Sequence, residues 1–212
     1  IDEMLRINQI AGYSIFSNSF TVRPIHQIDS SQKSLEILPF QLNNKLNSHH
    51  PHGWNDQGMI MAKGLQTMVS AGFRVKYGPL ELQLQPEFYF AANPNYSTTA
   101  GFGSNSGKSF SKFYGGQSAF KLNLGPIALG VSTQNLWWGP GQFSSLMMSN
   151  NAPGFFHYTF NTNKPLKTPI GSFEWQLVMG KLNEDTAAAF ENNYLKPFNP
   201  RNESRFFNGI VF

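Results

Sequence analysis

Residues 69–90 read VSAGFRVKYGPLELQLQPEFYF, and this stretch decides the class of fold. From Val69 to Tyr77 the odd positions are mostly large and apolar, and the even positions are small, polar or charged. An alternation with a period of two is typical of a β-strand whose two faces meet different surroundings. After Gly78-Pro79 the alternation resumes from Leu80 to Phe90. The stretch therefore predicts two long antiparallel strands joined by a tight turn.

The Gly-Pro pair suits a two-residue hairpin. A type II′ turn needs a positive φ at its first central position, and glycine adopts that conformation freely. Proline then supplies the negative φ of the second position, and the loop does not need the N–H that proline lacks. Pro86 falls inside the second strand, where we expect it to cost a ladder hydrogen bond or to mark a bulge.

The same unit recurs one hairpin later, where residues 120–124 and 127–132 alternate in the same way around Gly125-Pro126. A fifth strand is predicted from Phe173 to Met179. The stretches 93–116 and 139–171 are polar and rich in Gly, Asn and Ser, which predicts long loops. The helical period is absent, apart from a suggestion of one short turn around residues 186–190.

The composition narrows the function classes. Of 212 residues only 13% are charged, about half the usual share, and 15% are aromatic. The chain has no cysteine, which excludes disulfides and thiolate chemistry. It has no run of about 18 apolar residues and no leader-like start, so we expect a cytosolic protein or a processed export product. The net charge is +4 and the basic residues are scattered, so no nucleic-acid partner is expected.

Two architectures explain the alternation. In a soluble sandwich the apolar faces form the core and the polar faces are solvated. In an outer-membrane barrel the apolar face meets lipid and the polar face lines the lumen, with short turns at one end and long loops at the other. Strands of about 9–11 residues suit a membrane crossing. Aromatic residues also gather near strand ends, at 77, 88–90, 137–138 and 155–158. These features favour the barrel.

The most distinctive candidate site is Trp137-Trp138-Gly139-Pro140-Gly141, followed by Ser149-Asn150-Asn151. Aromatic faces stack on sugar rings and amides bond sugar hydroxyls, so this loop predicts saccharide contact. On chemistry alone, however, a belt of tryptophans at the membrane interface is the favoured explanation of Trp137 and Trp138.

The charged residues of the strands indicate a hydrated interior of the barrel. Arg74 and Glu87 fall on the polar faces of their strands, where a hydrated lumen explains them without catalysis. The histidines at 49, 50 and 52 suggest a solvated loop. We therefore expect no enzyme activity, no cofactor and no metal site.

Several blocks resemble one known family in the same order. They are HPHGWND at 50–56, AKGLQ at 62–66, QPEF at 85–88, NLWWGPG at 135–141, SLMMSNNAPGF at 145–155 and TPIGSFEWQL at 168–177. Together they are similar to the capsule assembly Wzi family, in its Bacteroidetes-type branch. His52 stands where an aromatic residue is expected, and Met61 where proline is expected. Both departures concern the chemistry of a loop and leave the expected fold unchanged.

The resemblance implies an all-β fold, an antiparallel transmembrane β-barrel. Residues 1–212 would form one domain, the N-terminal part of a larger barrel of about 18 strands. It would lie in the outer membrane of a Gram-negative bacterium and would bind or organise capsular polysaccharide or exopolysaccharide, without catalysis. The alternative is an accessory subunit of a larger outer-membrane transport or secretion complex. A diffusion channel and a glycan-cleaving enzyme are further hypotheses.

The expected partners are surface polysaccharide, outer-membrane lipid and other outer-membrane proteins. The candidate polysaccharide-binding residues are Trp54, Arg74, Glu87, Trp137, Trp138, Asn150 and Asn151, of which Arg74 and Glu87 would line the interior.

Overall fold

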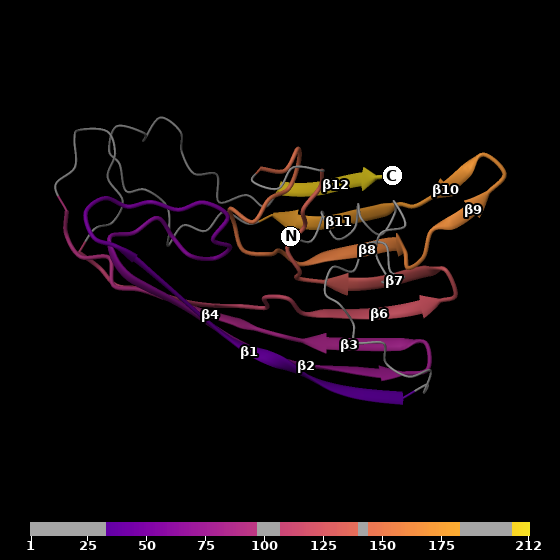
Figure 1. The fold of residues 1–212 in the computed structure, drawn as a ribbon, viewed down its shortest axis with the longest axis horizontal. Helices are drawn as coiled ribbons and strands as arrows, with labels where there is room; N and C mark the ends of the chain where they lie inside the picture. Colours follow the sequence, from indigo (N-terminus) through magenta and orange to yellow (C-terminus); the bar gives the residue numbers. More distant parts are fainter. Residues whose placement is uncertain (1–32, 97–106, 140–143, 183–204) are drawn as a thin grey trace.

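The structure is a computed structural model, and it describes residues 33–96, 107–139, 144–182 and 205–212. Within these ranges all regular structure is β. Ten strands form one sheet and two form a separate hairpin (Figure 1). The strands are β1 (Lys33–Asn47), β2 (Gly64–Tyr77), β3 (Leu80–Leu84), β4 (Glu87–Ala91), β5 (Phe110–Tyr114), β6 (Ala119–Leu124), β7 (Ile127–Ser132), β8 (His157–Thr162), β9 (Leu166–Thr168), β10 (Gly171–Phe173), β11 (Gln176–Leu182) and β12 (Arg205–Val211).

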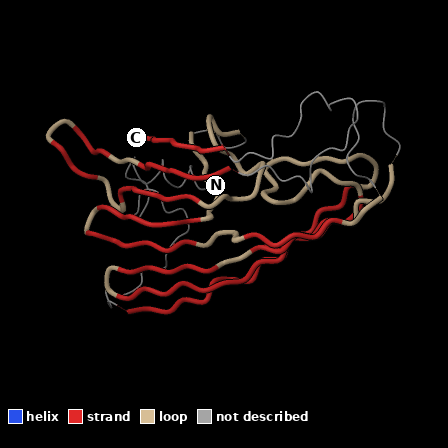
Figure 2. Tube along the Cα trace, turned by 180° about the vertical axis from the view of Figure 1, so that it is seen from behind, coloured by secondary structure: helices blue, strands red, loops and turns tan. Residues whose placement is uncertain are grey.

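The sheet is an antiparallel meander. In the order β1, β2, β3, β6, β7, β8, β11 and β12 each strand pairs with the next, and these strands lie side by side in both views (Figures 1 and 2). The strand β4 follows β3 along the same edge of β2, and β5 pairs with β4. This confirms the predicted all-β antiparallel fold. The described strands do not close into a barrel, because β1 and β12 stand at opposite edges of the sheet.

Both Gly-Pro turns form as predicted. Gly78 has φ 57° and Gly125 has φ 64°, and the flanking residues pair directly across each two-residue loop. The two turns lie at the same end of the sheet, on the right of Figure 1, where the β9–β10 hairpin also projects. The longer connections 48–63 and 133–156 join their strands at the opposite end.

Pro86 interrupts the second predicted strand. The segment 80–90 is two strands, β3 and β4, and both pair with β2 in one unchanged register. Proline has no N–H to give to the ladder, so the pairing stops there without a bulge. Gly72 lies opposite this break, where a Cβ would fall 2.1 Å from the Leu84 carbonyl oxygen. Only glycine fits so close to a neighbouring backbone.

Three strand predictions need correction. The segment Phe173–Met179 is divided between β10 and β11, because the Trp175 carbonyl accepts the N–H of Thr162 at the start of the hairpin. The predicted loop 93–116 contains β5. The predicted loop 139–171 contains β8 and β9. The helical turn suggested around residues 186–190 lies outside the described residues.

The two faces of the sheet have opposite polarity. Among the residues that the structure describes, twelve of the buried ones are polar or charged and ten are apolar. On the outer face large apolar side chains are exposed; for example, the exposed fraction is 75% for Ile37 and 83% for Phe206. The alternation read from the sequence is therefore present, with the polar face inside. None of the described residues forms a helix long and apolar enough to span a membrane.

Candidate functional site

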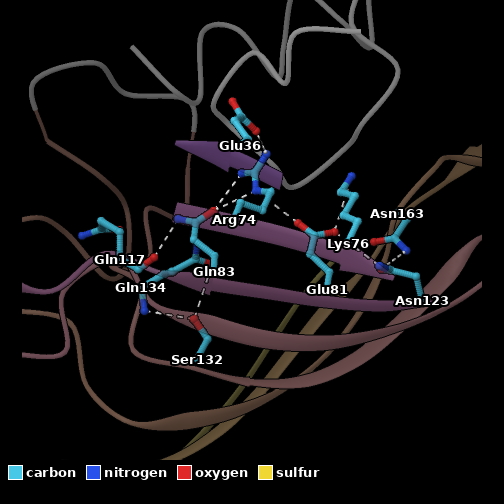
Figure 3. A network of polar contacts seen from close by, with 10 residues as sticks. All are labelled: Glu36, Arg74, Lys76, Glu81, Gln83, Gln117, Asn123, Ser132, Gln134 and Asn163. Carbon is cyan, nitrogen blue, oxygen red and sulfur yellow. Dashed lines mark hydrogen bonds and ion pairs between the residues drawn. The ribbon is translucent and has the colours of Figure 1, made fainter. Parts of the chain in front are cut away.

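A polar network lies on the inner face around Arg74, a residue that is only 4% exposed (Figure 3). Neighbouring strands supply its partners, because Glu36 and Gln83 flank Arg74 in the registers of β1 and β3. The Arg74 Nε and Nη2 atoms donate to Gln83 Oε1 at 3.1 and 2.8 Å. Carboxylate oxygens of Glu36 and Glu81 lie 3.5 and 3.4 Å from the guanidinium. Arg74 therefore lies buried on the polar face of the sheet.

The network runs on to Glu87 through Gln117. Gln117 lies between β5 and β6, in a connection that faces the Pro86 break and bonds its own N–H to the Gln85 carbonyl at 2.9 Å. Its backbone oxygen accepts from Gln83 Nε2 at 2.7 Å, and its side-chain Nε2 donates to Glu87 Oε1 at 3.1 Å. The other Glu87 oxygen accepts from the Tyr89 hydroxyl at 2.7 Å. Glu87 is only 1% exposed, so these bonds replace its hydration.

The same network reaches two loops that are far apart in sequence. The Tyr89 hydroxyl lies 3.3 Å from Gln57 Oε1, and the Gln57 N–H donates to the Asn150 carbonyl at 2.6 Å. The Asn55 N–H donates to Asn151 Oδ1 at 2.7 Å. We call the segments 54–57 and 150–152 with these bonds the loop junction. It brings the candidates Trp54, Asn150 and Asn151 into one place.

Backbone strain is concentrated at the junction. Asn55 and Gln57 have φ values of 54° and 58°, in the left-handed region that costs free energy for residues other than glycine. The Asp56 carboxylate between them accepts the N–H of Trp54 at 2.8 Å and pairs with Lys45 on β1. Such strain persists only where surrounding contacts over-determine the backbone, and it gathers at binding sites. The contacts of the junction therefore hold its backbone in an unusual conformation.

The three candidate tryptophans have different surroundings. Trp54 is 58% exposed, and Trp137 is half-buried. Trp138 is 5% exposed and belongs to an apolar cluster on the inner face of β11 and β12. Its Nε1 donates to Gln176 Oε1 at 2.8 Å. The tight turn predicted after these tryptophans includes Pro140 and Gly141, which lie outside the described residues.

The prediction that residues 88–90 form a group of aromatic side chains at a strand end also needs correction. Tyr89 was grouped with Phe88 and Phe90, yet Tyr89 is 1% exposed on the inner face while its two neighbours point outward. Tyr89 shares the parity of Glu87 in the period-two pattern, so the sequence did hold a signal for its position. Gln57 and Gln117 had no such signal, because both lie outside the strands.

No group of three His, Cys, Asp or Glu side chains in the described ranges is arranged to hold a metal ion. The Nδ1 atoms of His49 and His50 lie 2.6 Å apart in an exposed connection between β1 and β2. Glu81 lies 3.6 Å from the Lys76 ammonium in addition to its contact with Arg74. The described arrangement therefore offers hydrogen-bonding groups and exposed aromatic surface.

We expect Glu87→Gln to lower the free energy of unfolding by about 1–3 kcal/mol, because one buried acceptor becomes a donor beside the donors of Tyr89 and Gln117. Urea unfolding in detergent, followed by fluorescence, measures this change. Glu36→Gln is the matched control, since the Glu36 side chain is 27% exposed and water can replace its partner. Equal stability of both variants would show that the network contributes nothing to the junction.

A comparison with known proteins places these residues in context. The family model described as capsule assembly protein Wzi matches residues 45–202, about three quarters of the chain. The match includes the loop junction and, apart from Glu36, the polar network. No curated protein and no solved structure matches the chain at a significant level.

Proposed function

The chain belongs to the capsule assembly protein Wzi family, and from this premise we propose that it is an outer-membrane β-barrel protein of a Gram-negative bacterium. It binds or organises capsular polysaccharide or exopolysaccharide at the cell surface, and it acts as a lectin without catalysis. Its partners are the polysaccharide and the lipid around it.

The inverted polarity of the sheet carries this proposal. Soluble monomers rarely expose a contiguous apolar patch of more than a few hundred Å². Here the outer face carries exposed large apolar residues on almost every strand, while amides, hydroxyls and an arginine are buried inside. Lipid reverses the usual preference, because an apolar face is stable against acyl chains and a polar face lines the lumen.

The ends and edges of the sheet also support an outer-membrane barrel. Outer-membrane barrels have short turns on the periplasmic side and longer loops outside. The Gly-Pro turns lie at one end of the sheet and the loop junction at the other. The outer edges of β1 and β12 have no partner strand among the described residues, and lipid cannot satisfy such an edge. We therefore propose that the sheet is the N-terminal part of a larger barrel of about 18 strands.

The loop junction is the proposed polysaccharide-binding surface. The Trp54 ring offers an exposed face for stacking on a sugar, and the exposed Asn151 lies beside it with an amide for hydroxyl groups. Trp137 and Asn150 are half-buried, and we propose that their accessible parts add to this surface. Trp138, Arg74 and Glu87 act from the interior, where they hold the segments that carry the surface.

We expect Trp54→Ala to weaken polysaccharide binding at least about tenfold, because a central aromatic contact is worth more than about 1.4 kcal/mol. The assay is calorimetric titration of the full-length protein in detergent with the surface polysaccharide of its own organism. Phe206→Ala is the matched control, since Phe206 is exposed on the outer face of β12. Unchanged affinity of a folded Trp54→Ala variant would remove the junction from the site.

The alternative is an accessory subunit of a larger outer-membrane transport or secretion complex. The unpaired edges of β1 and β12 favour it, because a partner could supply the missing strands. Co-purification of stoichiometric partner proteins without bound glycan would support this alternative over the lectin.

A further inference from the structure

Lys121 lies on the inner face of β6. Its register places it between Glu81 on β3 and Gly130 on β7. A Cβ on Gly130 would fall 3.0 Å from Lys121 Cγ, so the lysine chain passes over the glycine. Among the described residues it makes no ion pair and no hydrogen bond, whereas its neighbours Arg74 and Lys76 are both paired.

The charges around Lys121 do not balance. The described groups facing it from β1, β2 and β3 are Arg74 and Lys76, which are cationic, and Glu36 and Glu81, which are anionic. Arg74 contacts both carboxylates, and Lys76 shares Glu81 with it. The strands β7 and β8 add Gly130, Thr159 and the buried imidazole of His157 near Lys121, and none of the three is an anion. The cluster therefore holds one positive charge more than its carboxylates neutralise.

An unpaired cation away from bulk water is costly unless an anion compensates it. The cluster is accessible to such an anion, because the side chains of Glu36 and Lys76 keep 27% and 29% of their exposure. Asn123, two residues further along β6, has an amide that donates to Glu81 at 3.3 Å and accepts from Asn163 at 2.8 Å, so polar groups adjoin the cluster. A surplus of one charge beside hydroxyl-binding groups matches a sugar that carries one carboxylate better than it matches a doubly charged phosphate.

We propose that the lumen contains a binding site for an acidic sugar, in which Lys121 pairs with the carboxylate of a uronic acid residue. This inference rests on the proposed polysaccharide-binding function and names its ligand class. The neighbouring amides bond the sugar hydroxyls, and the loop junction holds another part of the same polymer. The pairing is electrostatic, so it weakens as the salt concentration rises.

The test compares two forms of one ligand. Surface polysaccharide of the protein's own organism is used in its native form and after carbodiimide activation and borohydride reduction, which turn each carboxylate into a primary alcohol. The full-length protein in detergent is titrated with both forms. The variants are Lys121→Gln and, as a matched control, Lys181→Gln, because Lys181 is exposed on the outer side of β11.

The wild-type protein should bind the native form at least about tenfold more tightly than the reduced form, as expected for one charge-assisted hydrogen bond. Lys121→Gln should abolish this preference without lowering the urea midpoint, and Lys181→Gln should retain it. Three results would overturn the inference and leave the proposed function standing. The wild type could bind both forms equally, the preference could survive in Lys121→Gln, or the native polysaccharide could contain no acidic sugar. If neither form binds, the proposed function fails and the inference fails with it.

Discussion

Replacing Trp138 with alanine should lower the free energy of unfolding by about 3–5 kcal/mol, the usual cost of removing a buried aromatic side chain. Trp138 packs in the apolar cluster with Leu136 and Val178, and its ring centroid lies 6.0 Å from that of Phe207. Gly209 leaves room for it, since a Cβ there would fall 2.7 Å from the indole. Urea unfolding in detergent micelles measures the loss.

Two further variants separate the causes. Trp138→Phe retains most of the ring but leaves Gln176 Oε1 without its donor, so we expect a smaller loss of about 1–3 kcal/mol. Trp54→Ala removes an exposed tryptophan and should change stability by less than about 0.5 kcal/mol. Equal losses for Trp54→Ala and Trp138→Ala would contradict the burial that separates the two residues.

Trp138→Ala should also weaken polysaccharide binding, although Trp138 itself is not exposed to the ligand. Its backbone exchanges two hydrogen bonds of 3.0 Å with Met147, and these tie the segment that leads to Asn150 onto the inner face of the sheet. Without the indole the segment loses its anchor, and the junction loses its fixed geometry. The residue is therefore expected to act as a positioning residue.

The sequence predicts the two Gly-Pro hairpins because local rules determine them. It does not reveal β1, and the reason is specific. The register of β1 against β2 shifts between Leu38 and Gln41, around Pro39. Leu35 and Ile37 point outward from odd positions before this bulge, and outward residues such as Leu42 and Leu46 occupy even positions after it. The alternation changes phase, so a period-two search sees two short fragments instead of one strand.

The strand β8 was missed for a different reason. Its outward residues Tyr158 and Phe160 alternate with His157, Thr159 and Asn161. The resulting segment is too polar to resemble a strand of a soluble protein, yet it fits a strand that faces a polar interior. A polar composition between Gly-rich segments therefore predicts a loop only if the apolar face is assumed to be the buried one.

The candidate site was predicted only in part. Alternation puts Arg74 and Glu87 on the polar faces of their strands, and both are buried in the structure. The contact between Asn55 and Asn151 joins residues 96 positions apart, and no local pattern encodes it. Nor does a local pattern encode the place of Gln117 opposite the Pro86 break, which arises from the pairing of the strands. The resemblance to a family indicated which blocks matter, and the geometry shows how the loop blocks meet.

Phe120→Arg should lower the free energy of unfolding in phospholipid vesicles by about 2–4 kcal/mol, the cost of an arginine on the lipid face near the bilayer centre. Phe120 lies on the outer face of β6 and is 46% exposed. It stands four residues before the end of the strand at Leu124, which is about 13 Å from the turn. That distance is half of an apolar band about 25 Å tall. Guanidinium unfolding with vesicles present measures the effect.

Ile170→Arg is the matched control for this substitution. Ile170 is fully exposed in the connection between β9 and β10, which projects beyond the turn end of the sheet (Figure 1). An arginine there should change stability by less than about 0.5 kcal/mol, because it remains in water or among headgroups. In a soluble sheet Phe120→Arg would be just as neutral, since a half-exposed side chain can point its charge into solvent. The difference in unfolding free energy between Phe120→Arg and Ile170→Arg thus reports whether lipid or water surrounds the outer face. Equal effects of the two substitutions would place that face in water and remove the basis for a barrel in the membrane.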